Sequence, residues 1–282
     1  RQFVDNLAKF CQDFGIPFLL FFNLAILDLS SAFYIELLIF FYISMIFSFI
    51  IISCVTYFIF KQAYNNSIIL GFCAMFSNGV LLGLPISELA FGTNSLFVNY
   101  TIIIGHAPLC YLIGITFIEL AKIKNDSYLF GIKKSLKAIL LNNLTLGILL
   151  GLGFNLFNFS FSPTTKELLK LATSWIIPIS LFTMGGVLYH YRVSRNYKIP
   201  AAIISTSLLI QPAVVYLLGS HFSNIEKDYL RNAVVMAAMA PGLNAYFFAN
   251  MYGECRDVVA TTILASTVLT VFSSTLWIYF LY

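Results

Sequence analysis

Nine long apolar segments, joined by short loops, constrain this 282-residue chain more than any other feature. Most of them reach about 20 residues, the length that an α-helix needs to cross the hydrocarbon core of a bilayer. Only 10% of the residues are charged, whereas soluble domains carry roughly 25%. The pattern predicts an all-α polytopic membrane protein. Its helices are expected at residues 14–29, 36–60, 67–88, 96–120, 136–157, 168–189, 199–220, 229–252 and 258–282.

Two of these segments are interrupted near their middle, and the interruptions resemble each other. The third segment is broken at Ser77–Gly79, and the eighth is broken at Pro241–Gly242, with Asn244 just beyond. Glycine and proline weaken a helix, and a backbone group freed inside a bilayer needs a partner. Broken helices at corresponding places in two halves of a chain mark the binding sites of many secondary transporters. We therefore expect the two breaks to cross near the middle of the membrane.

The order of these features recurs along the chain. Pro17 and Pro178 lie in similar motifs, and the sequence offset between them is nearly the same as the offset between Asn78 and Gly242. One unbroken segment lies between the matched features in each half, and one more follows them. This order indicates two five-helix repeats, of which the first lacks its first helix. Because each repeat has an odd number of crossings, the two copies insert upside down relative to each other, which is an inverted-repeat topology.

The predicted domains follow from this repeat. Residues 1–121 form the first repeat without its first helix, 122–135 form a linker, and 136–282 form the second five-helix repeat. Alternating segments place 12 of the 16 basic residues on one side of the membrane, and the side richer in Lys and Arg faces the cytoplasm. We therefore expect the N-terminus of this chain in the cytoplasm and the C-terminus outside, with the loops Lys122–Lys137 and Arg192–Lys198 cytoplasmic. Since the chain opens without a methionine, its true N-terminus is expected to be absent.

The chemistry predicted for the crossing comes from its helix ends. Each break creates a helix N-terminus, where unpaired N–H groups and the helix dipole favour an anion. The side chains of Asn78 and Asn244 add hydrogen-bond donors, and neither 67–88 nor 232–252 contains Lys or Arg. A carboxylate could therefore be held without a buried basic residue. The full set of predicted binding residues is Ser77, Asn78, Gly79, Pro241, Gly242 and Asn244. The alternative interpretation is that the breaks are packing kinks and the asparagines link helices.

Other polar residues inside the apolar segments are weaker candidates. His106, beside Pro108, is either a proton relay or a structural histidine whose hydrogen bonds are satisfied. Five residues are expected to line the same cavity: Pro17, Asn23, Pro178, Ser180 and His106. No cofactor is indicated, and both H⁺ and Na⁺ remain open as coupling ions. The five cysteines have no metal-site spacing, so they indicate neither a metal site nor a disulfide framework.

These motifs resemble those of the auxin efflux carrier family. The resemblance is strongest at Ala240–Gly253, with the sequence APGLNAYFFANMYG, and it continues at Pro178–Gly186 and Asn78–Pro85. Leu141–Asn143 looks like the family's Asn-Pro opening of the sixth helix, with Asn143 in place of the proline. The first break also departs from the family's frequent Pro-Asn or Asn-Thr, so no substrate is carried over.

The resemblance implies ten transmembrane helices in two inverted five-helix repeats, with a fold similar to bile acid:sodium symporters. In that fold a scaffold panel and a core with two crossed broken helices move against each other. The family includes bacterial relatives regarded as permeases for malonate or other organic acids. A multi-pass protein of the cell membrane, here a bacterial inner membrane, is therefore expected, and the resemblance adds a homodimer to the expected assemblies.

Together these features predict a secondary transporter that moves a small organic anion, a carboxylate, by alternating access. A sodium-coupled carrier like the bile acid symporters is the alternative, and a channel ranks third because no filter-like repeat or pore-lining ring is visible. An enzyme is not expected, since the sequence lacks His-Glu-x-x-His, Gly-x-Ser-x-Gly and paired intramembrane aspartates. The expected partners are the organic anion and the lipid bilayer, and the net charge of +4 indicates no nucleic acid.

Overall fold

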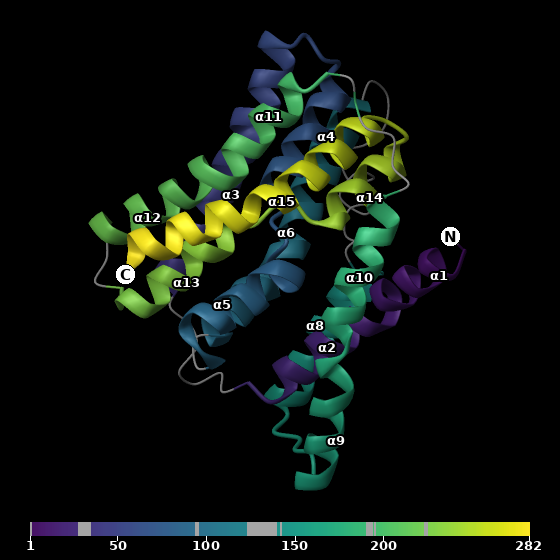
Figure 1. The fold of residues 1–282 in the computed structure, drawn as a ribbon, viewed down its shortest axis with the longest axis vertical. Helices are drawn as coiled ribbons and strands as arrows, with labels where there is room; N and C mark the ends of the chain where they lie inside the picture. Colours follow the sequence, from purple (N-terminus) through teal and green to yellow (C-terminus); the bar gives the residue numbers. More distant parts are fainter. Residues whose placement is uncertain are drawn as a thin grey trace. The chain divides into compact units, whose positions relative to one another are not determined.

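The computed structural model describes residues 2–27, 35–93, 96–122, 140–141, 143–189, 194, 196–222 and 225–282 (Figure 1). Every named element within these ranges is a helix. Five helices are long and apolar enough to cross a membrane, at Gln2–Ala25, Ile35–Ile59, Leu96–Ile118, Lys198–His221 and Arg256–Leu281. The prediction of an all-α polytopic membrane protein is confirmed.

The chain divides into two compact units, and each takes segments from both halves of the sequence. Unit 1 consists of Arg1–Ala32 and Ile132–His190, and unit 2 consists of Phe33–Gly131 and Tyr191–Tyr282. These units are bodies in space, whereas the predicted repeats are stretches of sequence. The repeat boundaries therefore stay a prediction, and all of the linker 122–135 except Lys122 lies outside the described residues.

Unit 1 contains the first membrane helix and three helices of the second half. Its elements are α1 (Gln2–Phe10), η1 (Cys11–Gly15), α2 (Ile16–Ala25), α8 (Asn143–Leu156), α9 (Pro163–Ser174) and α10 (Ile176–Leu188). The first helix begins at Gln2 and not at residue 14, so the predicted start was wrong. Residues 2–13 are amphipathic, with Asp5, Lys9 and Asp13 among apolar side chains, and this charged content hid the helical period.

The proline motifs of unit 1 lie directly after interruptions of the regular α-helix. Pro17 lies in the first turn of α2, directly after the π-helical turn η1. Pro178 lies in the first turn of α10, which follows α9 after a single turn residue, Trp175. A proline is tolerated in a first helical turn, because the N–H that it lacks has no partner there.

Two glycines let α8 pack closely on α2. A Cβ added at Gly151 would lie 2.6 Å from the carbonyl oxygen of Phe21, and a Cβ at Gly147 would overlap the backbone of Pro17. At the end of this contact, the Asn155 amide donates to the carbonyls of Leu24 at 2.8 Å and Leu27 at 2.6 Å. The pairing therefore combines close backbone approach with a cap on the last turn of α2.

Unit 2 contains both interrupted segments and the unbroken helices around them (Figure 1). Its first-half elements are α3 (Ile35–Cys54), η3 (Val55–Ile59), α4 (Tyr64–Met75), η4 (Gly79–Gly83), α5 (Leu84–Phe91) and α6 (Leu96–Lys122). Its second-half elements are α11 (Lys198–Ser205), η6 (Thr206–Ile210), α12 (Gln211–Phe222), α13 (Lys227–Ala237), α14 (Leu243–Tyr252) and α15 (Arg256–Leu281).

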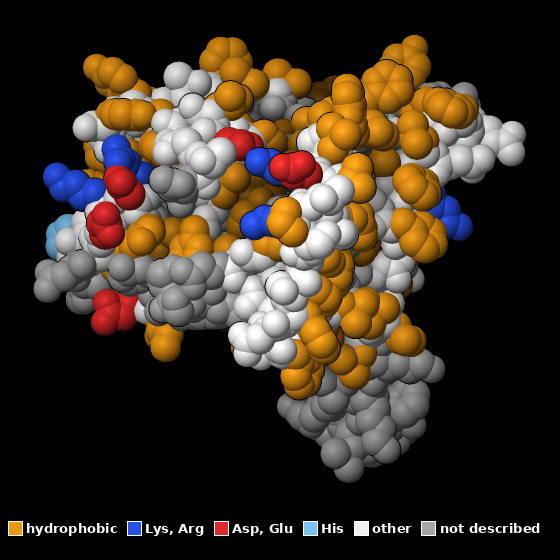
Figure 2. Space-filling view, turned by 90° about the horizontal axis from the view of Figure 1, so that it is seen from below, with side chains coloured by type: hydrophobic (Ala, Val, Ile, Leu, Met, Phe, Trp, Pro, Cys, Tyr) orange, Lys and Arg blue, Asp and Glu red, His pale blue; other side chains and the backbone are white. Residues whose placement is uncertain are grey.

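The surface is rich in large apolar side chains, as expected of helices in lipid. Phe47 and Ile50 of α3 and Val268 and Phe272 of α15 are among the exposed ones. Figure 2 shows hydrophobic side chains over much of the visible face, with the charged side chains gathered in a few places. α4 and α13, by contrast, are buried over most of their length inside unit 2.

Candidate functional site

The two interrupted segments cross, and their breaks are joined by hydrogen bonds. α4 ends at Met75 and α13 ends at Ala237, and the extended residues beyond them lie antiparallel, with Ser77 opposite Pro241. The Asn78 N–H donates to the Ala240 carbonyl at 2.8 Å, and the Gly242 N–H donates to the Phe76 carbonyl at 2.9 Å. Each break therefore satisfies backbone groups that the other leaves unpaired, as an apolar environment requires.

The predicted binding residues of unit 2 gather around this bridge. Ser77, Asn78, Gly79, Pro241 and Gly242 are buried, and Asn244 is half-buried. A Cβ added at Gly242 would lie 3.5 Å from the Cα of Asn78, so the two breaks are in direct contact.

The two predicted asparagines have different partners at the crossing. The Asn78 side-chain oxygen accepts from the Leu81 N–H at 3.3 Å, which makes Asn78 the N-cap of the η4–α5 half-helix. The Asn244 side-chain oxygen accepts from the Tyr111 hydroxyl at 3.2 Å. α14 begins after Gly242 with no side-chain cap. The N-terminus of α14 is thus the less protected of the two.

The crossing brings together two helix C-termini as well as two N-termini. α4 and α13 approach it with their negative ends, and η4–α5 and α14 leave it with their positive ends. The bridge itself uses the carbonyls of Phe76 and Ala240 as acceptors. The crossing therefore combines positive and negative helix ends, whereas the sequence predicted positive ends alone.

His106 and Thr270 support the two breaks from the neighbouring unbroken helices. His106 of α6 places Nε2 3.4 Å from the Ser77 hydroxyl, and Thr270 of α15 accepts from the Ala240 N–H at 3.1 Å. His106 and Thr270 are separated by the same sequence offset that relates Asn78 to Gly242. His106 also packs against the rings of Phe41 and Phe76, with centroids 5.8 and 5.1 Å away.

Apolar contacts hold together the four half-helices around the bridge, which are α4, η4–α5, α13 and α14. The rings of Phe72 in α4 and Phe248 in α14 stack with centroids 3.8 Å apart. On the other side, Met236 of α13 lies where Gly79 and Gly83 leave room, because a Cβ at Gly79 would be 2.7 Å from the Met236 Cε. Close approach at Gly79 therefore serves packing between η4 and α13.

Sequence reasoning missed Tyr111 and Thr270. Tyr111 contacts Asn244 through its hydroxyl. Its ring packs against the ring of Phe72, and the two ring centroids are 5.5 Å apart. Its signal was a tyrosine shortly after His106 inside a mainly apolar helix. Thr270 gave no signal by itself, but the offset of the predicted repeat, counted from His106, points to it.

The remaining predicted residues belong to unit 1 and are described within that unit alone. Pro17 is buried in α2, and Asn23 of the same helix is half-buried. Pro178 is exposed on α10, whereas Ser180 is buried with a hydroxyl that has no partner among the described residues. That these four share a cavity with the crossing stays a prediction.

Comparison with known proteins identifies the family. The sequence profile of the family described as "Membrane transport protein" matches residues 2–278. This match covers nearly the whole chain, so the chain belongs to that family, and its resemblance to the auxin efflux carriers is confirmed. A protein of Rhizobium meliloti (strain 1021) named "Putative malonate transporter" is 25% identical over 114 residues, which is 40% of this chain. The matched part spans 36%, about a third, of that protein's length.

Proposed function

We propose that this membrane transport protein is a secondary transporter of a small carboxylate, which binds at the crossing of the broken helices. The observation that carries the proposal is the junction at Ser77 and Pro241, where two half-helices begin inside the most buried part of unit 2. Non-helical backbone at membrane depth is tolerated only where it is buried in protein or lines a cavity, and broken helices of this kind form the binding sites of many transporters. Helix N-termini are suited to anions.

The structure favours one side of the junction for the carboxylate. The N-terminus of η4–α5 is capped by Asn78, whereas α14 begins with no side-chain cap. We infer that the carboxylate contacts the first turn of α14 and the amide of Asn244. In this arrangement Tyr111 orients Asn244, and Asn78 holds the opposite half-helix in place.

Alternating access would then move unit 2 relative to unit 1, so that the crossing faces each side of the membrane in turn. The family resemblance supports this assignment of a moving core and a panel. We further propose that the protein lies in the cell membrane with its first described helix starting in the cytoplasm. Malonate is the first substrate to test, because the name of the Rhizobium meliloti relative contains it.

A sodium-coupled carrier is a second candidate, and one observation favours it. The C-terminal ends of α4 and α13 also meet at the crossing, and helix C-termini attract cations. Transport of the same carboxylate with and without a sodium gradient separates the two candidates.

The experiment that tests the proposal is binding followed by flux. Purified protein is screened by thermal shift against small mono- and dicarboxylates, and any that stabilise it are followed as labelled substrates in proteoliposomes. A carrier gives saturable uptake at concentrations near the binding constant. Uptake that rises linearly with concentration, together with single-channel currents, would exclude a carrier.

A further inference from the structure

His106 of α6 is the only Asp, Glu, Lys, Arg or His side chain that is buried among the described residues. Histidine is also the side chain that changes charge between about pH 5 and 8. An ionisable residue at membrane depth is rare and usually functional, because a charge there needs a partner. Binding of a carboxylate at α14 gives His106 no role of its own.

The two ring nitrogens of His106 have different surroundings. Nε2 lies 3.4 Å from the Ser77 hydroxyl, inside the first break, whereas Nδ1 is buried with no partner among the described residues. A histidine with a purely structural role would have both nitrogens bonded, since a buried polar atom without a partner is unfavourable. This arrangement disfavours the structural role that the sequence left open and favours a role that changes with protonation.

The contact with Ser77 is compatible with both charge states of His106. The imidazolium has an N–H group on each nitrogen, and a hydroxyl can accept a hydrogen bond as well as donate one. The protonated ring can therefore donate to the Ser77 oxygen from Nε2 and keep a second N–H at Nδ1. Ser77 follows the C-terminal end of α4, which ends at Met75, and the negative end of a helix favours a positive charge.

Helix α6 connects His106 to the proposed carboxylate site. Tyr111 of the same helix donates to the Asn244 side chain at 3.2 Å. The Phe76 ring packs against both side chains, with its centroid 5.1 Å from that of His106 and 6.1 Å from that of Tyr111. A protonated His106 would thus place its charge at the crossing together with the carboxylate. Opposite charges attract more strongly there than in water, because the dielectric constant is lower.

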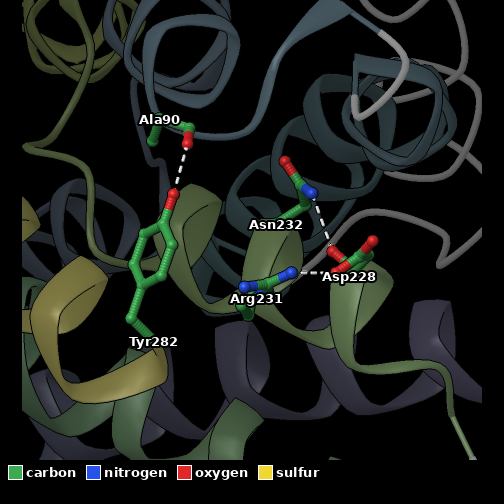
Figure 3. Close-up of polar contacts among 5 residues, drawn as sticks. All are labelled: Ala90, Asp228, Arg231, Asn232 and Tyr282. Carbon is green, nitrogen blue, oxygen red and sulfur yellow. Dashed lines mark hydrogen bonds and ion pairs between the residues drawn. The ribbon is translucent and has the colours of Figure 1, made fainter.

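The charged residues of the neighbouring helices are exposed or paired. Elements α3, α4, η4, α5 and α13 pack against α6, and α4 and η4 contain no charged residue. Glu36 of α3, Glu88 of α5 and Lys227 of α13 are exposed. Arg231 forms an ion pair with Asp228 in the first two turns of α13, whereas the crossing lies at the other end of that helix (Figure 3).

The other titratable groups of these elements around His106 are thiols and phenols. They are Tyr42 of α3, Cys73 of α4, and Cys110 and Tyr111 of α6. Thiols and phenols ordinarily titrate above the range of histidine. A change of charge at the crossing near neutral pH is therefore assigned to His106.

We propose that His106 is the proton-binding site that couples carboxylate transport to H⁺. The neutral ring takes one proton from water when the carboxylate binds, and both are released on the other side of the membrane. An unpaired charge is costly at this depth, so the proton stays on His106 only while the carboxylate is bound. This inference rests on the proposed function and names its coupling ion as a proton and not Na⁺.

The first test counts the protons that are taken up with the carboxylate. Malonate, or another carboxylate that stabilises the protein in the thermal-shift screen, is titrated calorimetrically at about pH 6 in two buffers of different ionisation enthalpy. The parent protein should take up as much as about one proton more per carboxylate than His106→Gln, because the binding of the two ligands is reciprocal. Its affinity should also rise roughly tenfold more than that of His106→Gln between about pH 8 and pH 6. The titration of the carboxylate itself is common to both proteins and cancels.

His221→Gln is the matched control, because His221 is exposed at the end of α12. It should take up as many protons as the parent protein. Glutamine can still bond to Ser77, so His106→Gln removes the titration and keeps a polar contact at the break. If His106→Gln does not purify as a monodisperse protein, the parent decides with a monocarboxylate, which is already ionised at about pH 6. Binding without proton uptake by the protein would then overturn the proposal.

Flux gives a second readout. In proteoliposomes without Na⁺, an acidic exterior should drive uphill uptake of the labelled carboxylate by the parent protein, whereas His106→Gln should only equilibrate it. His221→Gln should behave as the parent does. Equal proton uptake by the parent and His106→Gln would overturn the proposal, and so would uphill uptake that needs a Na⁺ gradient and ignores a pH gradient.

Failure of the coupling and failure of the proposed function give different results. If Asn244→Ala weakens carboxylate binding but the parent takes up no proton, the crossing remains the binding site and only the role of His106 is wrong. If no carboxylate in the screen binds, the proposed function fails, and the coupling fails with it.

Discussion

At the residue scale, Asn78 and Asn244 have separate roles, although the sequence predicted the same role for both. The Asn78 oxygen caps a half-helix, and the Asn244 oxygen is held by Tyr111 of a distant segment. The residue types and the breaks were predictable because glycine, proline and amides in an apolar segment conflict with a simple membrane helix. The partners were not, because a contact between distant segments leaves no trace in local spacing.

The difference between the asparagines predicts different effects of alanine. Asn244→Ala should weaken carboxylate binding by roughly 10- to 150-fold, the effect of losing a hydrogen bond to a charged group of about 1.5–3 kcal/mol. Asn78→Ala should instead lower the free energy of unfolding, by about 1 kcal/mol, because it removes the N-cap of the η4–α5 half-helix. Isothermal titration and thermal unfolding check the two effects.

Two further variants serve as controls for this prediction. Asn78→Ser retains a capping oxygen and should restore stability. Cys54→Ala lies on an exposed position of α3 and should change neither quantity. Equal binding by the parent protein and Asn244→Ala would mean that the carboxylate does not contact α14.

A second residue-scale prediction concerns Cys255, in the loop between α14 and α15. Burial, reinforced by the nearby carboxylates of Glu254 and Asp257, raises the pKa of its thiol to about 12. An ordinary thiol titrates near pH 8.5, and the thiolate is the reactive form. In a variant that keeps only this cysteine, the alkylation rate should therefore keep rising through pH 10.

The comparison for Cys255 is an exposed cysteine placed at Asn196 in a cysteine-free background. Its alkylation rate should level off near pH 9. A rate at Cys255 that levels off at the same pH would show that its thiolate is not disfavoured.

At the element scale, the sequence predicted the positions of the apolar helices because their length and composition are dictated by the bilayer. It missed residues 2–13, where charged residues share a helix with an apolar face. It also could not give the exact position of an interruption beside a proline. Pro17 follows a π-helical turn and Pro178 follows a single turn residue, and both lie in a first helical turn.

The packing of α8 on α2 yields an element-scale prediction with an internal control. Gly151→Ala would place a Cβ 2.6 Å from the Phe21 carbonyl oxygen, whereas nothing lies within 4 Å of a Cβ at Gly153. Overpacking of this kind costs about 1–3 kcal/mol, so Gly151→Ala should lower the unfolding temperature and Gly153→Ala should not. Thermal unfolding in detergent compares them. Identical unfolding temperatures would contradict the close contact of the two helices.

At the scale of the whole molecule, each compact unit takes helices from both halves of the chain, as the predicted repeat would require. The bridge at the crossing has the same pattern from either side, because Asn78 donates to Ala240 and Gly242 donates to Phe76. The two donors are related by the same sequence offset as the two acceptors. This agreement supports the prediction of an inverted repeat.

The sidedness prediction is tested with cysteines on exposed residues outside the long apolar helices. Ser194, a natural choice in the predicted cytoplasmic loop, is unsuitable because it is buried and its N–H donates to the Thr261 hydroxyl at 2.7 Å. Asn196 in the same loop and Glu167 in α9 are both exposed.

In a cysteine-free background, a membrane-impermeant maleimide added to intact cells should modify Glu167→Cys and spare Asn196→Cys, because basic residues concentrate on the cytoplasmic side. Permeabilised cells should give labelling at both positions, which controls for reactivity. The reverse pattern in intact cells would invert the topology, and with it the side from which the proposed carboxylate is bound.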